Sequence, residues 1–500
     1  MSEIQATFQG AHVFITGATG FMGQVLVEKL LRTCHQLERV YLIVRPKKGI
    51  NEEERFKTIF DGYLYGPLKN EQPDFLKKVT LISGDFDKPG LGISEADRDI
   101  LKQNVNFVFH VAATVRFDEK LHIASAVNVL ATKNLMELSK EMYNLKAFIY
   151  ISTAYANCPL REIDEKFYEP GMKSAEFLQL TNSMDEATLN AITPIVIGKW
   201  PNTYTFSKCI AEDVVRELAD GLPVAVIRPS IVVSTTKEPI QYWINNVYGA
   251  AGVAIGVAVG LIRVLRAHST NVLDIIPVDM AIHCSIAAAW EVATTKPSSP
   301  KIYNYVSSAQ RPITIGQYMY YLENSVIIPA TICIWVNFLF LEGNRHLCNL
   351  LVLLLHTIPA IIADTAALIL RKKPKLLRGY LKVHKFTEVL TFFTIQQWNF
   401  KNGNVLTLWD KLSRKDKSLF HFNIEELDWA EYLGYMLRGV RLYILGIQYD
   451  EKSIESGKTH FRRLKWIHFI VVKILQLLLA LSIFFSAKYL YNNVIYPCIT

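Results

Sequence analysis

The amino-acid sequence predicts an α/β fold in which a doubly wound parallel sheet precedes a mainly helical C-terminal domain and a C-terminal transmembrane helix. From residue 11 to about 150, short apolar strands alternate with helical patterns. A glycine-rich stretch joins the first strand to the first helix, and an apolar stretch near the C-terminus is long enough to cross a bilayer. At 500 residues the chain exceeds one typical domain, so we expect two or three structural units.

The composition favours membrane attachment over nucleic-acid binding. Half of the residues (50%) are hydrophobic, and the net charge of +8 is spread thinly along the chain. No basic stripe with interleaved aromatic residues is present, so nucleic acid is not expected as a partner. Basic residues instead gather beside apolar segments, at 371–375 and 462–465, which suits a membrane surface.

The seven cysteines form no C-x-x-C pair and no metal-ligand spacing. We therefore expect reduced structural thiols in a cytosolic compartment and no metal site. The first residues lack the basic and apolar regions of a secretory signal. This pattern predicts that the glycine-rich domain faces the cytosol.

Five apolar runs are expected to form the first strands of the sheet. They are Val13–Ile15, Val40–Val44, Val79–Ser83, Phe107–His110 and Ala147–Ser152.

The stretch from Thr16 to Gly23 connects the first strand to a helix with an apolar stripe. Gly17 would permit a tight turn, Gly20 would let a dinucleotide approach the backbone, and Gly23 would let the helix pack closely. We therefore expect this stretch, including Thr19 and Phe21, to hold a pyrophosphate at the helix N-terminus. The alternative is an ordinary strand-to-helix turn.

The second strand ends in basic residues where an NAD-specific site would carry an acidic one. Arg45, Lys47 and Lys48 suit a 2′-phosphate, which predicts NADP(H) rather than NAD(H). The alternative for Arg45 is a solvated strand end.

Two further turns follow the third and fourth strands and are expected at the same edge of the sheet. Asp85 could hydrogen-bond the adenine, and Ala112 and Ala113 could pack under the ribose. A plain turn aspartate and plain core alanines are the alternatives.

Tyr204 and Lys208 carry the predicted chemistry. At i and i+4 on a helix they share one face, so the ammonium could lower the pKa of the phenol. Thr153 or Ser152, at the end of the fifth strand, could bind a substrate oxygen. Together these groups predict proton transfer to or from a carbonyl or hydroxyl oxygen.

These motifs resemble the extended short-chain dehydrogenase/reductase family. Within it, residues 151–157, 201–208 and 274–279 resemble fatty acyl-CoA reductases, particularly those of insects, and the match runs over nearly the whole chain. The resemblance implies a Rossmann-type domain that reduces a long-chain fatty acyl-CoA with two NADPH to a primary alcohol and releases CoA. Such alcohols are precursors of waxes, ether lipids, hydrocarbons or pheromones.

The resemblance also implies roles for single residues. Tyr204 would be the proton donor, Lys208 would bind the nicotinamide ribose, and Thr153, with Ser152 as its neighbour, would orient the carbonyl oxygen. Asn128 resembles the asparagine that supports the lysine through a water. The alternative for Asn128 is a helix-surface amide.

One region departs from the family pattern. After the Arg228-Pro229-Ser230 strand, residues 240–246 read Ile-Gln-Tyr-Trp-Ile-Asn-Asn, and residues 254–259 are unusually apolar. We expect this region to line the acyl site rather than to cross a membrane, because a crossing there would divide the catalytic domain. The preferred chain length therefore does not follow from the relatives.

We expect three units along the chain. Residues 1–316 form the NADP-binding reductase domain, with a substrate-binding part at about 235–316. Residues 317–450 form the helical domain, and 451–500 form a basic linker and anchor that spans the membrane at about 467–488. The alternative for the anchor is a buried or interfacial amphipathic helix.

Residues 325–340 and 349–370 form a second pair of apolar segments. We expect them to form a helical hairpin that packs within the C-terminal domain or dips into one leaflet, and the alternative is that they cross the membrane.

The expected location is a membrane with the catalytic domain in the cytosol, and the endoplasmic reticulum is favoured over the peroxisome. The oligomeric state is left open.

Two other functions fit parts of the pattern. A membrane-bound hydroxysteroid dehydrogenase would share the tyrosine and lysine, and an NADPH-binding scaffold would need neither.

Overall fold

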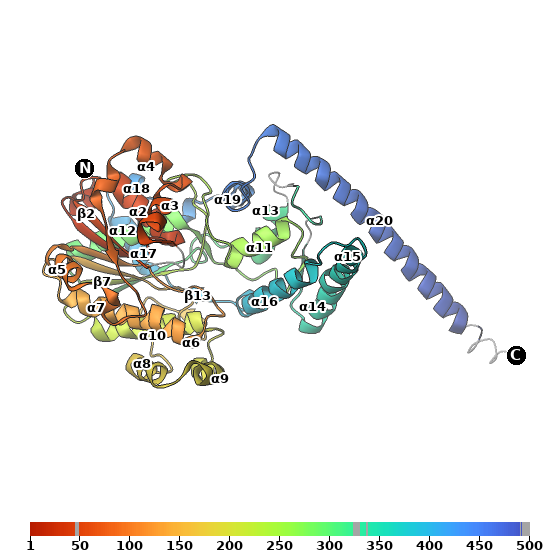
Figure 1. Cartoon of the computed structure of the whole chain (residues 1–500), viewed down its shortest axis with the longest axis horizontal. Coiled ribbons are helices and arrows are strands. Elements are labelled where there is room, and N and C mark those ends of the chain that lie inside the picture. The colour runs from red at the N-terminus through yellow and green to blue at the C-terminus, as the bar shows by residue number, and fades with distance from the viewer. Residues whose placement is uncertain (46–49, 324–330, 337–338, 491, 493–500) are drawn as a thin grey trace.

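The computed structural model describes residues 1–500 except 46–49, 324–330, 337–338, 491 and 493–500. Its centre is a seven-stranded sheet with the order β11-β7-β5-β4-β1-β2-β3, and all neighbouring strands are parallel (Figure 1). The strands are β1 (His12–Thr16), β2 (Arg39–Val44), β3 (Val79–Ser83), β4 (Phe107–His110), β5 (Ala147–Ile151), β7 (Val224–Pro229) and β11 (Lys301–Tyr305).

The five predicted strands are confirmed, each to within one residue at either end. Apart from the half-buried His12, the residues of β1, β4 and β5 are buried, as expected of strands covered by helices on both faces. Val13 of β1 lies opposite Val40 of β2 on one side and Phe107 of β4 on the other. The strand order reverses between β1 and β4, which is where such sheets bind ligands.

Helices cover both faces of the sheet. One core contains side chains of α2 (Phe21–Thr33), α12 (Val278–Thr295) and α17 (Gly403–Lys411). The other contains side chains of α5 (Glu95–Asn104), α7 (Ala131–Lys140) and α10 (Thr203–Leu218). Further helices lie around these two cores: α1 (Glu3–Thr7), α3 (Glu52–Phe60), α4 (Gly66–Glu71), α6 (Leu121–Ala124), α8 (Ser174–Ser183), α9 (Glu186–Ile197) and α18 (Arg414–Leu419).

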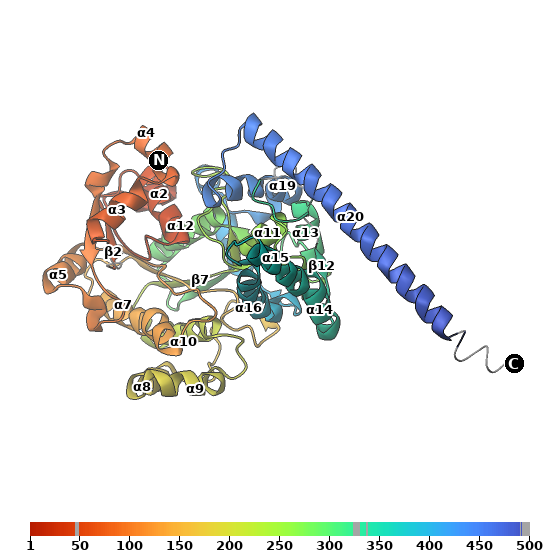
Figure 2. The same ribbon diagram turned by 45° about the vertical axis from the view of Figure 1, so that its right-hand side comes forward.

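A second lobe lies beyond the carboxyl ends of the strands (Figures 1 and 2). It contains α11 (Gly249–Ala258), α13 (Ile315–Glu323), α14 (Arg345–Val352), α15 (Ile358–Ile369), α16 (Leu376–Thr394) and α19 (Trp429–Gly439). Three two-stranded pairs complete the structure: β8 (Ile231–Val233) with β10 (Ile275–Pro277), β9 (Val264–Leu265) with β12 (Phe340–Leu341), and β6 (Glu162–Ile163) with β13 (Asn399–Phe400).

The C-terminal segment returns to the sheet after α16. Asp416 of α18 accepts the backbone N–H groups of Glu3 and Ile4 at 3.3 and 3.1 Å. Lys29 of α2 donates to the carbonyl oxygen of Leu419 at 2.7 Å. Residues far beyond position 317 thus help to form the core around the N-terminal strands.

Among the described residues, two helical segments are long and apolar enough to cross a membrane. They are Arg345–Ile369, in which α14 and α15 are joined through a π-helical turn, and α20 (Glu451–Leu490). Their most apolar windows are 11% and 0% buried. Of the hairpin partner expected at 325–340, residues 331–336 and 339–340 are described and are not helical, and the rest lies outside the described residues. The observed partner of α15 is α16, which carries more charges and gave a weaker apolar signal.

Candidate active site

The glycine turn lies between β1 and α2 and lines a cavity of about 640 Å³. Gly17 has φ +73°, and a Cβ there would lie 2.6 Å from the backbone nitrogen of Ala112. A Cβ on Gly23 would lie 2.1 Å from the carbonyl oxygen of Gly17. Gly20 is the N-cap of α2, whose first turn has no acidic residue. The backbone therefore leaves a helix N-terminus open to an anion, as a dinucleotide pyrophosphate requires.

The remaining residues of the turn divide into two groups. Thr19 and Phe21 line the cavity with the glycines, and the Phe21 ring lies 5.5 Å from that of Trp243. Thr16 does not line the cavity. Its hydroxyl lies 2.7 Å from His110 Nδ1 and accepts the N–H of Ala112 at 3.2 Å, so Thr16 supports the turn from beneath.

The other expected cofactor residues lie at the same edge of the sheet. Arg45 and Ala112 line the cavity, and the Arg45 guanidinium, 47% exposed, lies 3.8 Å from Asp87. Asp85 does not line it, whereas the adjacent Phe86 does. Phe86 was missed because no sequence signal separates a turn aromatic from a core one. Lys47 and Lys48 lie outside the described residues.

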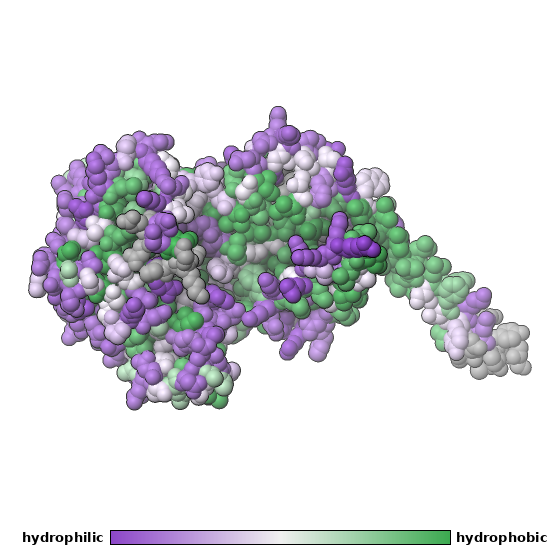
Figure 3. All heavy atoms as spheres, in the orientation of Figure 1, coloured by the Kyte–Doolittle hydropathy of each residue, from purple (hydrophilic) through white to green (hydrophobic). Residues whose placement is uncertain are grey.

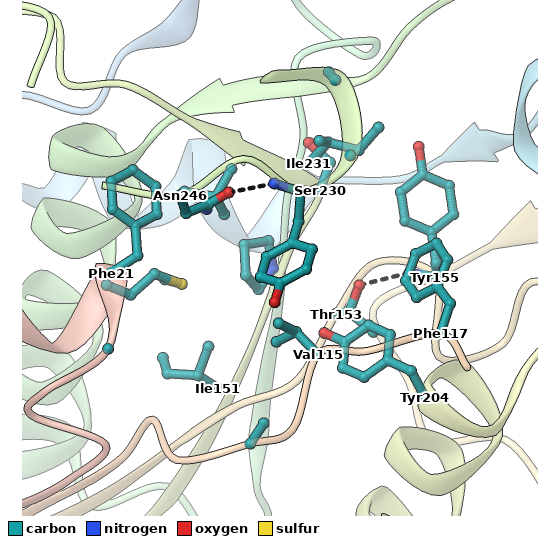
Figure 4. Close-up of a pocket in the computed structure, with 18 of the residues that line it drawn as sticks. Phe21, Val115, Phe117, Ile151, Thr153, Tyr155, Tyr204, Ser230, Ile231 and Asn246 are labelled. Atoms are coloured by element: carbon teal, nitrogen blue, oxygen red, sulfur yellow. Dashed lines mark hydrogen bonds between the residues drawn. The ribbon is translucent and has the colours of Figure 1, made fainter. Parts of the chain in front are cut away.

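Tyr204 and Thr153 meet at the centre of the cavity (Figure 4). Burial raises the pKa of Tyr204 to about 12, and a hydrogen bond with Thr153 opposes this shift. The expected lowering of the Tyr204 pKa by Lys208 is therefore wrong for this structure, because burial dominates. The Tyr204 phenol is therefore protonated at neutral pH, which is the form that can donate a proton, and a pKa nearer the working pH would make it a stronger acid. The Phe117 ring stacks 5.8 Å from the Tyr204 ring.

Lys208 lies one turn further along α10, where its ammonium is buried. It donates to the carbonyl oxygen of Ile151 at 2.7 Å and lies 3.4 Å from the Tyr150 hydroxyl. Burial lowers the pKa of Lys208 to about 7, and the negative charge of Glu212 opposes that shift. Lys208 thus joins the helix that carries Tyr204 to the strand that precedes Thr153.

Asn128 is buried within a π-helical segment, Ser125–Leu130, so it is not a helix-surface amide. Its side chain accepts the N–H of Thr114 at 2.9 Å and donates to Ser207 Oγ at 2.8 Å. It therefore ties the loop that carries Phe117 to α10. Such π-helical turns are frequent at functional sites.

The far half of the cavity is mainly apolar, with a few polar side chains. The 240–260 region borders it as expected, through Asn245, Asn246 and α11. The helices of the second lobe close it with side chains that include Ala250, Val253, Tyr318, Met319, Leu390 and Phe393. The glycine turn and this apolar pocket are thus parts of one cavity, with Tyr204 and Thr153 between them.

The fold and this site define a nicotinamide-dependent oxidoreductase of the extended short-chain dehydrogenase/reductase class. Two family models, both described as male sterility protein, match residues 15–285 and 355–446. Fatty acyl-CoA reductase wat of Drosophila melanogaster is 39% identical over 97% of this chain and 94% of its own length. Human fatty acyl-CoA reductase 1 is 34% identical over 99% and 96%. The chain belongs to the fatty acyl-CoA reductase family.

Solved structures share the fold. The terminal reductase domain of the myxalamid biosynthetic pathway has a TM-score of 0.56 at 18% identity, with 88% of this chain and 93% of that chain covered. A reductase domain of a non-ribosomal peptide synthetase from Mycobacterium tuberculosis has a TM-score of 0.55 at 15% identity, with 89% and 96% covered.

Proposed function

We propose that this protein reduces long-chain fatty acyl-CoA with NADPH to a primary alcohol and releases CoA. The observation that carries the proposal is the single cavity in which Tyr204 and Thr153 separate the glycine turn from an apolar pocket. The overall reaction consumes two NADPH and two protons for each alcohol and each free thiol formed. Residues 1–316 would bind the cofactor. Residues 235–316, together with α13 and α16 of the 317–450 region, would enclose the acyl chain.

The residues of the chain have distinct tasks in this reaction. Gly17, Gly20 and Gly23 would hold the pyrophosphate, and Arg45 the 2′-phosphate, of NADPH, which supplies hydride when bound. Thr153 and Tyr204 would hydrogen-bond the carbonyl oxygen of the thioester and stabilise its developing negative charge. Tyr204 would then give that oxygen its proton, and Lys208 would keep Tyr204 in position through the Ile151 carbonyl.

Detection of the product tests this proposal. Detergent-solubilised protein is incubated with NADPH and saturated acyl-CoAs of increasing length, and fatty alcohol is measured by gas chromatography. We expect alcohol from long chains. Oxidation of hydroxysteroids with NADP⁺, in the absence of any alcohol, would instead identify a hydroxysteroid dehydrogenase. Cofactor binding without turnover of either substrate would identify a scaffold.

The proposal includes attachment to a membrane through α20. Its apolar part is exposed, and Arg462, Arg463 and Lys465 precede it, which favours a cytosolic catalytic domain. Fractionation of expressing cells is expected to place the protein with endoplasmic reticulum markers rather than with peroxisomal ones.

A further inference from the structure

The hairpin of residues 345–394, formed by α14, the π-helical turn, α15 and α16, exposes an apolar outer face. Ile362 is 64% exposed and Ile369 is 78% exposed. The exposed leucines and isoleucines of this face include Leu350, Leu354, Ile358, Ile361, Ile362 and Ile369. Figure 3 shows hydrophobic surface over this lobe and along the first part of α20, while the surface of the α/β domain is mixed.

The inner face of the hairpin is polar. His356 is buried, and its Nε2 accepts the backbone N–H of Arg263 at 2.9 Å. The Arg263 guanidinium donates to the Tyr380 hydroxyl at 2.6 Å, and the rings of His356 and Tyr380 stack 4.9 Å apart. A helix in water buries its apolar side and exposes its polar side. The reversed arrangement is typical of helices that contact lipid.

The connection between α15 and α16 argues against a crossing. Asp364 accepts the backbone N–H groups of Lys375, Leu376 and Leu377, each at 3.0 Å, so the chain turns back at once. At the far end of α16, the Thr394 hydroxyl donates to the carbonyl oxygen of Arg266 at 2.6 Å. At the start of the hairpin, Arg266 Nε donates to the carbonyl oxygen of Gly343 at 3.3 Å. Both ends of the hairpin thus lie beside Arg266, and a crossing by α14 and α15 would force α16 to cross back.

The charges of α16 make such a return unfavourable. Arg378, Lys382 and Lys385 are exposed along this helix. Each basic side chain at the centre of a bilayer costs about 2.5–3.5 kcal/mol on insertion scales. At the headgroup level Arg378 and Lys382 are favourable, by about 1 kcal/mol each near an anionic surface. Lys385 instead pairs with Asp118 of the α/β domain at 3.2 Å.

The tip of the hairpin carries a basic cluster. Arg371, Lys372, Lys373 and Lys375 are all exposed there. The hairpin also lies near the start of the apolar part of α20. Trp335 donates to His468 of α20 at 3.2 Å and lies 5.9 Å from the Arg263 guanidinium that contacts Tyr380. Figures 1 and 2 show the hairpin and α20 on the same side of the molecule.

We propose that the hairpin 345–394 is embedded in one leaflet of an anionic membrane, on the side of the catalytic domain, without crossing the bilayer. The apolar outer face would contact acyl chains and the basic tip would contact phosphate headgroups. Leu390, Phe393 and Thr394 of α16 line the cavity, so the hairpin is also the wall between the cavity and the lipid.

Labelling at single cysteines of the full-length protein tests the proposal. In a Cys498→Ser background the six remaining native cysteines are buried, so an introduced cysteine is the exposed thiol. Ile362→Cys and Leu354→Cys are labelled with an environment-sensitive fluorophore and reconstituted into phosphatidylcholine–phosphatidylserine vesicles. We expect blue-shifted emission and quenching by brominated acyl chains. Tyr143→Cys, on the α/β domain and 77% exposed, is the control and is expected to show neither. Emission at Ile362 and Leu354 like that of the control would overturn the proposal.

The topology is tested separately with Lys372→Cys in intact microsomes. A membrane-impermeant maleimide is expected to react with Lys372→Cys and with Tyr143→Cys equally, because both would lie on one side. Reaction of Lys372→Cys only after the membrane is opened would show that the hairpin crosses. Neither readout depends on turnover, so failure of the proposed reaction would leave both results interpretable.

Discussion

The hydroxyl of Ser152 donates a hydrogen bond to Glu212 Oε1 at 2.5 Å. Glu212 also pairs with the buried Arg228 guanidinium, whose Nη2 lies 2.7 Å from Oε2. Ser152 is thereby committed to a buried ion pair, whereas the adjacent Thr153 hydroxyl lines the cavity beside Tyr204 and accepts the N–H of Tyr155 at 3.3 Å. Two neighbouring hydroxyls at one strand end thus have different tasks.

Substitution of the two hydroxyl residues should separate these tasks. We expect Thr153→Val to lower kcat/KM for acyl-CoA by about 10²–10³-fold, the usual effect of losing one oxyanion donor. Ser152→Ala should instead lower the free energy of unfolding by about 1–3 kcal/mol, because a buried carboxylate oxygen loses a donor. A greater loss of kcat/KM in Ser152→Ala than in Thr153→Val would contradict this assignment.

Arg45 should select the cofactor. Arg45→Ala is expected to raise the Kd for NADPH about 10- to 100-fold, because the 2′-phosphate loses a charge-assisted hydrogen bond. The Kd for NADH should stay nearly unchanged, because NADH has no 2′-phosphate. Fluorescence titration measures both. Asp87→Asn, which removes the observed ion-pair partner, is the control and should not weaken NADPH binding. Equal losses for the two cofactors in Arg45→Ala would show that Arg45 does not contact the 2′-phosphate.

Gly23 should tolerate no side chain. In Gly23→Ala the methyl group would collide with the backbone of Gly17 and Ala18, so the turn must move. We expect loss of NADPH binding and a lower melting temperature. Gly66→Ala is the matched control, since a Cβ there meets no atom within 4 Å. Unchanged NADPH affinity in Gly23→Ala would exclude the glycine turn as the cofactor site.

Lys208 should make stability depend on pH. Its pKa is about 7 in the folded protein and about 10.4 when unfolded. Between these values the unfolded chain binds one more proton, so stability rises with pH, by up to about 1.4 kcal/mol per unit. The penalty of burying the ammonium is complete below about pH 7 and fades above it. We therefore expect the melting temperature of wild type to rise relative to that of Lys208→Met as pH increases from about 7 to about 10. Parallel melting curves would mean that Lys208 does not titrate in this range.

Local patterns predicted the strands and the glycine turn, because each depends on a few consecutive residues. Arg45, Ala112, Tyr204 and Thr153 were correctly expected at one cavity, since parallel strands end at one edge of a sheet.

Long-range contacts were not predictable in the same way. Nothing in the sequence distinguishes Ser152 from Thr153, because Glu212 is brought to Ser152 only by the packing of α10 on β5. The high pKa of Tyr204 depends on its burial in the folded protein. The partner of α15 depends on contacts such as those of His356 with Arg263.

The ratio of NADPH consumed to free thiol released is the most direct test of the proposed reaction. With a saturated long-chain acyl-CoA, we predict two NADPH for each thiol, and loss of both signals in Tyr204→Phe while NADPH still binds. One NADPH for each thiol would mean that the enzyme releases an aldehyde. No thiol release from any acyl-CoA by protein that binds NADPH would contradict the account.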